Sequence, residues 1–260
     1  MLNSIASKVI SALFSEYIET VDSSQLEVAI WSGVVHLENV SIKNDALLSQ
    51  SIPFVVKKGI VGTIDLKFPW TKLSSEACEI TIRDVFLVAT IAENFLIPID
   101  LTNKTPRDDN ESQNTNKNVS QTGLLTGILG QIINNLKFHV ENFHVRIEIP
   151  IGTKYFALGV TFNAIDWFSV DDNGNPTFVS EDSLILKKNA KIQNLAIYID
   201  TDATLISDDT SIFLKDMMDE IRSNNHEFLI SPSTFEAAIT NKKASDIPES
   251  ISETCLTGQQ

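Results

Sequence analysis

The sequence predicts an α+β protein that is mainly β. Short segments in which apolar and polar residues alternate recur along the chain, whereas segments with helical spacing are few. The length of 260 residues is enough for one large domain or two small ones. We expect roughly eight to eleven strands and about three helices from this pattern.

The spacing of apolar residues predicts an amphipathic helix over about residues 2–21. Apolar residues recur at spacings of three and four, and serine and glutamate fill the other side. The helix either packs on its own domain or contacts a bilayer or a membrane protein. The membrane or partner contacts that we expect on it are Leu2, Ile5, Val9 and Leu13.

Beyond this helix the hydrophobic period changes from 3.6 to 2, which is typical of strands. Alternation predicts strands over 26–30, 35–42, 60–68, 78–89, 138–149, 156–162, 195–199, 227–230 and 235–239. Helical spacing returns over 124–136 and 211–223. Within the strand over 60–68, alternation places Ile60 on the same face as Ile64. Asn173-Gly174 predicts a tight turn.

Two strands change parity partway, which predicts β-bulges. The apolar positions before and after Asn39 differ in parity, and so do those before and after Asn142. A bulge at each asparagine would bring all of these apolar residues to one face.

The chain divides into four parts. Residues 103–122 have almost no apolar side chain and cannot offset their ordering entropy, so we expect a disordered loop. Residues 1–102 hold the first helix and the first part of the sheet, and residues 123–240 hold a helix and the continuation of the sheet. The polar tail at 241–260 is also expected to be disordered.

Each predicted strand has one apolar face, and such a face must be covered. A second sheet covers it in a sandwich, and closure covers it in a barrel. Three helices of modest length cannot cover so many strands, so a molecule from outside the chain, such as a lipid, is the third option. Periodicity does not choose among the three.

Composition excludes several functions. The net charge of −14 gives no electrostatic footprint for nucleic acid and no broad attraction to anionic headgroups. The two cysteines lie far apart, no signal peptide is recognisable, and no run of 18 apolar residues occurs, so we expect a cytoplasmic protein. No nucleophile elbow, phosphate-binding glycine loop or metal-ligand pattern occurs, so we expect no enzyme, metal or cofactor.

The segment from Tyr17 to Lys43 resembles the chorein N-terminal region, which begins the vacuolar protein sorting-associated protein 13 family and, more distantly, autophagy-related protein 2. The similar motifs include Ile30-Trp31-Ser32-Gly33, Leu37-Glu38-Asn39-Val40 and Leu66-Lys67-Phe68-Pro69-Trp70. Further matches follow in order at 131–146, 156–162 and 191–198, so the resemblance covers most of residues 1–240.

The resemblance implies an open, curved antiparallel sheet, a taco-like groove with an N-terminal capping helix and one or two further helices. It implies that the groove carries glycerophospholipids at organelle contact sites, with its N-terminal end at a membrane surface or membrane protein, commonly at the endoplasmic reticulum. Family members are usually long rods. A chain of 260 residues is then expected to be a shuttle, one end of an assembly or a truncated gene.

The lipid-binding residues that we expect alternate along the strands: Ile64, Leu66, Phe68, Ile80, Ile82, Phe143, Val145, Ile147, Phe156, Leu158, Val160, Phe162, Leu195 and Ile197. A different class of function is also open, a non-enzymatic adaptor or scaffold that docks a protein partner at a membrane. An uncovered groove would favour transport, and a closed sandwich would favour the adaptor.

Overall fold

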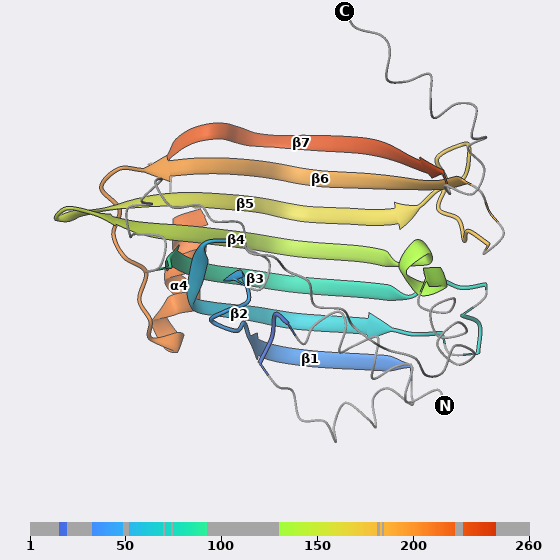
Figure 1. The fold of residues 1–260 in the computed structure, drawn as a ribbon, viewed down its shortest axis with the longest axis horizontal. Helices are drawn as coiled ribbons and strands as arrows, with labels where there is room; N and C mark the ends of the chain where they lie inside the picture. Colours follow the sequence, from blue (N-terminus) through green and yellow to red (C-terminus); the bar gives the residue numbers. More distant parts are fainter. Residues whose placement is uncertain are drawn as a thin grey trace, which may run out of the picture.

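The computed structural model describes residues 16–19, 33–48, 52–69, 71–73, 75–92, 130–180, 183, 185–221 and 226–242. These residues form one open seven-stranded sheet in which every strand lies beside the next in sequence, so β1 and β7 are its edges (Figure 1). The strands are β1 (Val34–Ser41), β2 (Phe54–Lys67), β3 (Glu79–Ile91), β4 (Lys137–Ile151), β5 (Lys154–Ser169), β6 (Ile185–Asp200) and β7 (Glu227–Lys242). The helix α4 (Thr210–Ile221) stands between β6 and β7 in sequence, and residues 130–135 are also helical.

The expectation of a fully antiparallel sheet is wrong for one pair of strands. Five neighbouring pairs are antiparallel, but β3 and β4 run parallel, with Ile80 beside Phe138 and Ala89 beside Ile147. A parallel pair needs a long crossover, and the segment between the two strands supplies one. Alternation identifies strands without giving their direction, and for this reason the sequence did not reveal the parallel pair.

A row of irregular positions crosses the sheet. Asn39, Asp84, Asn142 and Asn194 all have positive φ, a conformation that asparagine and aspartate tolerate better than most residues. The pairing registers place Asn39 and Asp84 opposite Gly62, and Asp84 opposite Asn142. Each strand therefore changes parity at the same level. The changes of parity expected at Asn39 and Asn142 are present, but the pairing registers run unshifted past both residues because neighbouring strands change parity at the same level. Neither asparagine therefore forms an isolated β-bulge, in which two residues oppose one. We call these aligned positions the bulge row.

One face of the sheet is covered by α4. Phe213 and Met217 of this helix are fully buried and form a cluster with Ile60 of β2, Phe86 and Val88 of β3. The expectation that Ile60 shares a face with Ile64 is wrong, because the parity of β2 changes between them at the bulge row. We call this side the helix face and the opposite side the groove face.

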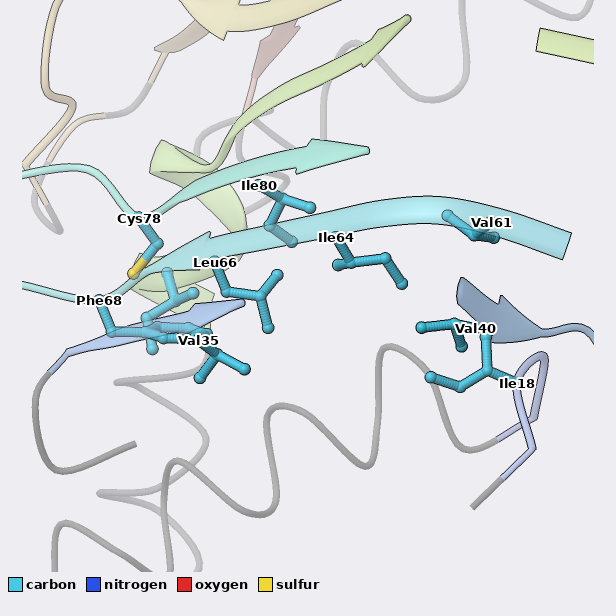
Figure 2. Packing of buried hydrophobic residues seen from close by; sticks show 10 residues of the cluster. Ile18, Val35, Val40, Val61, Ile64, Leu66, Phe68, Cys78 and Ile80 are labelled. Atoms are coloured by element: carbon cyan, nitrogen blue, oxygen red, sulfur yellow. The ribbon is translucent and has the colours of Figure 1, made fainter. Parts of the chain in front are cut away.

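The groove face carries the main apolar cluster near β1 and β2. Figure 2 shows Ile64 and Leu66 of β2 beside Val35, Phe68 and Cys78. Because residues on both sides of the bulge row reach this face, its apolar surface continues across the row on β2 to β5, as a regular alternation could not achieve.

Other predicted elements have mixed outcomes. The helix expected over 211–223 is confirmed as α4. The two short strands expected after it are one long strand, β7, and the turn at Asn173-Gly174 joins β5 to β6. The N-terminal helix with Leu2, Ile5, Val9 and Leu13, the loop 103–122 and nearly all of the tail lie outside the described residues.

Candidate functional site

A cavity of about 550 Å³ opens on the groove face over β2 to β5. Every residue around it is aliphatic or aromatic, and none is charged: Tyr17, Ile18, Ile42, Ala46, Leu47, Val61, Ile64, Ile80, Ile82, Val85, Leu87, Leu136, Phe138, Val140, Phe143, Phe162 and Ile165. Its size falls within the roughly 300–1,000 Å³ of pockets that bury a small molecule.

Local contacts hold the floor and one rim of the cavity in place. Phe143 and Phe162 stack at a centroid distance of 4.4 Å on neighbouring strands, next to the bulge row. The rim between β1 and β2 folds over the groove face, held by backbone bonds from Lys43 N to Tyr17 O and from Val56 N to Asn44 O, each 2.9 Å. This places Ala46 and Leu47 against the cavity.

The opposite rim is closed by polar contacts. The buried amide of Asn135, in the helical turn 130–135, donates to Val179 O at 2.9 Å and accepts from Val179 N at 2.6 Å. The buried amine of Lys188 and the hydroxyl of Ser169 both donate to Asn134 O. Burial lowers the pKa of Lys188 to about 8. These bonds hold Leu136 against the cavity from this side.

The fourteen residues expected to bind lipid divide into three groups. Five of them line the cavity: Ile64, Ile80, Ile82, Phe143 and Phe162. Leu66 and Phe68 are buried in the adjoining apolar cluster of β1 and β2, and Val145 packs on a cluster formed by Val56, Leu87 and Ala89. The remaining six lie partly buried on β4, β5 and β6: Ile147, Phe156, Leu158, Val160, Leu195 and Ile197.

Sequence reasoning missed several residues that line the cavity. Val61, Val85 and Leu87 lie across the bulge row from Ile64 and Ile82. Positions where the hydrophobic parity changes next to an asparagine or aspartate were the signal for this group. No comparable signal marked Leu47, because a connection that folds over a sheet has no fixed period.

The helix face is polar at its centre, and its buried charged residues form ion pairs. Arg146 of β4 is fully buried, and its guanidinium contacts Glu220 of α4 at 2.6 Å and Asp200 of β6 at 3.1 Å. Buried Glu148 accepts from Lys57 Nζ at 3.0 Å and from Ile206 N at 2.9 Å. These contacts fasten α4 and the segment before it to the sheet, because an unpaired buried charge costs several kcal/mol.

His144 and Tyr198 continue this network. His144 Nδ1 donates to Met217 O at 3.2 Å, and Nε2 accepts from the Tyr198 hydroxyl at 2.7 Å. Burial lowers the pKa of His144 to about 3, so the ring is neutral. The Tyr198 ring lies across Gly159 of β5, where an added Cβ would come within 1.9 Å of it. Only glycine leaves room for this ring.

Beyond α4, the helix face carries a row of alternating charges. Contacts of 2.6 to 3.0 Å join seven side chains of β1 to β5 in order: Glu38, His36, Asp65, Arg83, Glu141, His139 and Asp166. Burial opposes protonation of His139, but hydrogen bonds to Glu141 and Asp166 outweigh it and raise the pKa of this ring. The row is solvated, so each pair contributes little to stability.

The two faces of the sheet therefore differ in polarity. The buried charges of the helix face, Arg146 and Glu148, are paired within the chain, whereas the groove face offers an apolar cavity whose lining holds no charged group. Such a cavity can shelter hydrocarbon. Fold and cavity together define the class: an open β-groove protein with one apolar side.

Comparison with known proteins agrees with this class. Residues 1–118 match the model of the VPS13-like family N-terminal region. Over 92% of its length the chain is 28% identical to the intermembrane lipid transfer protein vps13B of Dictyostelium discoideum. The identity to intermembrane lipid transfer protein VPS13 of Chaetomium thermophilum is also 28%, again over 92% of the chain. It reaches 31% over 76% of the chain with vps13A of Dictyostelium discoideum.

This chain carries the N-terminal region of the VPS13-like family. It spans only 4%, 8% and 7% of the length of the three relatives. No helix within the described residues is long and apolar enough to cross a bilayer.

Proposed function

We propose that this chain binds phospholipid acyl chains in the cavity of the groove face and moves lipids between membranes at organelle contact sites. The observation that carries the proposal is the uncharged cavity of about 550 Å³ on an open sheet. The names of the relatives, intermembrane lipid transfer proteins, support the same process.

The physical basis is the cost of exposing hydrocarbon to water. Burial of an acyl chain is worth about 0.8 kcal/mol per CH₂ group, so a chain of roughly 16 carbons faces a barrier near 13 kcal/mol. A continuous apolar surface removes most of this barrier without a catalytic group. This mechanism is that of a carrier and not of an enzyme.

Partners follow from the same argument. The cargo is a glycerophospholipid whose headgroup stays in water, because the cavity lining offers it no charged partner. The N-terminal segment with Leu2, Ile5, Val9 and Leu13 contacts a membrane surface or membrane protein, at the endoplasmic reticulum. Tyr17 and Ile18 follow this segment and line the cavity, so such a contact would lie beside the groove.

The experiment combines native mass spectrometry with transfer of a fluorescent phospholipid between tethered liposomes. Wild-type protein should carry phospholipid and accelerate transfer. The double variant Ile82→Asp/Ile165→Asp places charges in the cavity at partly buried positions, so bound lipid should disappear and transfer should fall at least about tenfold, roughly 1.4 kcal/mol.

The matched control is Ile212→Asp, an exposed isoleucine on α4 at the other face, which should behave as wild type. Cooperative urea unfolding of all variants checks the fold. Lipid-free wild-type protein, or normal transfer by the folded double variant, would contradict the proposal.

A further inference from the structure

The hairpin of β4 and β5 extends beyond the rest of the sheet. The ladder between β3 and β4 ends at Ile147, and the ladder between β5 and β6 ends at Ala157. From Glu148 to Phe156 the two strands pair with each other, joined by a two-residue turn with Gly152 at positive φ. In Figure 1 the hairpin reaches further than any other strand at its end of the sheet.

An apolar path leads from the cavity to the tip of this hairpin. Phe143 lines the cavity, and the next groove-face residues of β4 are Val145, Ile147, Ile149 and Ile151. On β5, Phe162 lines the cavity, and Val160, Leu158 and Phe156 lead outward beside them. Every residue on this path is apolar, and the exposed fraction of the side chains rises to 60% at Ile151.

The two ends of the strands differ in chemistry. The tip contains no acidic residue, and Lys154 is the one charged residue from Ile149 to Leu158. At the other end, the turn between β5 and β6 carries Asp171 and Asp172, and the groove face is closed there by the polar contacts of residues 130–135. Lys154 pairs with Asp202, in the connection after β6, at 3.0 Å, so the charge at the tip is balanced. In a chain of net charge −14, the hairpin tip is therefore a local apolar site.

We propose that the β4–β5 hairpin inserts its tip, with Ile151, into the headgroup region of a phospholipid bilayer, and that acyl chains slide between bilayer and cavity along the path behind it. The occupant is a lipid surface because the path is continuous with the cavity. The inference rests on the proposed function and adds to it a lateral route over one rim of the sheet.

The test places an environment-sensitive fluorophore at the tip. Ile151→Cys is labelled with nitrobenzoxadiazole in a Cys255→Ser background, where the remaining Cys78 is buried. Phosphatidylcholine vesicles should shift the emission to the blue and raise it. The same label at Asn173→Cys, in the polar turn of the opposite rim, should not respond. A blue shift that depends on protein concentration without vesicles would instead show self-association and overturn the proposal.

A second variant tests the route. Ile151→Asp should lower transfer about tenfold while the amount of bound lipid stays unchanged, because the cavity is intact. Ile185→Asp, at an exposed isoleucine of the other rim, should transfer normally. Unchanged transfer and an unresponsive label in a wild-type protein that does carry lipid would overturn the hairpin route alone. Absence of lipid from the wild type would overturn the proposed function as well.

Discussion

Single side chains on the helix face are fixed by packing and not by their usual preference for water. His144, Arg146 and Glu148 alternate with apolar residues, which alone would place them on a solvated surface. They are buried because α4 lies over them and supplies Met217 O and Glu220 as partners. Alternation therefore shows that a polar residue lies on the face opposite the apolar one. It does not show whether that face is exposed to water or covered by another element.

The neutral ring of His144 predicts a loss of stability in mild acid. Its folded pKa, about 3, lies below the unfolded value of roughly 6.5, so the unfolded chain binds more protons between these values. The contribution is complete above pH 6.5 and is lost as the pH falls. Urea unfolding should show a free energy that drops by about 1.4 kcal/mol per pH unit from pH ~6 to pH ~5.

Replacing His144 by Gln should remove this dependence of the unfolding free energy on pH. His139 provides the control, because its pKa is raised and its contribution is present below the unfolded pKa and is lost as the pH rises through the folded one. The variant His139→Gln should therefore keep the acid slope. A slope that persists in His144→Gln would show that other groups cause the acid sensitivity.

At the scale of elements, the bulge row decides which residues reach the cavity. Phe138 and Val140 precede Asn142 and Phe143 follows it, yet all three apolar residues line the same cavity. The change of parity in β4 makes this possible, and Asn142 holds it with φ of 55° and a hydrogen bond from its amide to Asp84. Gly62 leaves room for Asp84, whose Cβ would lie 2.8 Å from an added Cβ.

Two substitutions separate the backbone from the side chain at Asn142. Asn142→Gly keeps the positive φ and loses only the bond to Asp84, at a cost of about 1 kcal/mol. Asn142→Val also strains the backbone, because a β-branched residue resists positive φ, so it should cost a further ~1–3 kcal/mol. Urea midpoints measure the difference. Equal midpoints for the two variants would remove the positive-φ conformation as a source of stability.

At the scale of the whole molecule, the sheet sets the reach of the groove. Seven strands have six spacings of about 4.8 Å, so the described sheet spans roughly 29 Å across its strands. This is close to the ~30 Å hydrocarbon core of one bilayer.

Net charge predicts an unusual salt dependence of membrane association. A chain of charge −14 is repelled by anionic lipid, so the attraction has to be apolar. Binding to phosphatidylserine vesicles should therefore strengthen when salt rises from about 0.01 M to about 1 M, where the screening length falls from roughly 30 Å to 3 Å. Vesicle flotation measures this, with phosphatidylcholine vesicles as the insensitive control. Weaker binding in high salt would point to a basic surface.

The sequence by itself determined that the chain forms one-sided strands, that their parity changes at Asn39 and Asn142, and that a helix covers about residues 211–223. These features depend on local spacing, which residue order records directly. The resemblance to the chorein region was also readable there, because it rests on motifs in a fixed order. Five cavity residues, among them Ile82 and Phe143, followed from the same alternation.

Only the tertiary structure decided what lies against each face. The position of α4 turned His144 and Arg146 into buried residues and assigned Ile60 to the helix face. The parallel pair of β3 and β4, the connection that brings Leu47 to the cavity and the overhang of Ile151 also depend on contacts between distant segments. The physical reason is that a period of two residues determines which side chains of a strand share a face. What covers that face, the direction of the neighbouring strand and how far a hairpin extends beyond the sheet depend on segments that are remote in sequence.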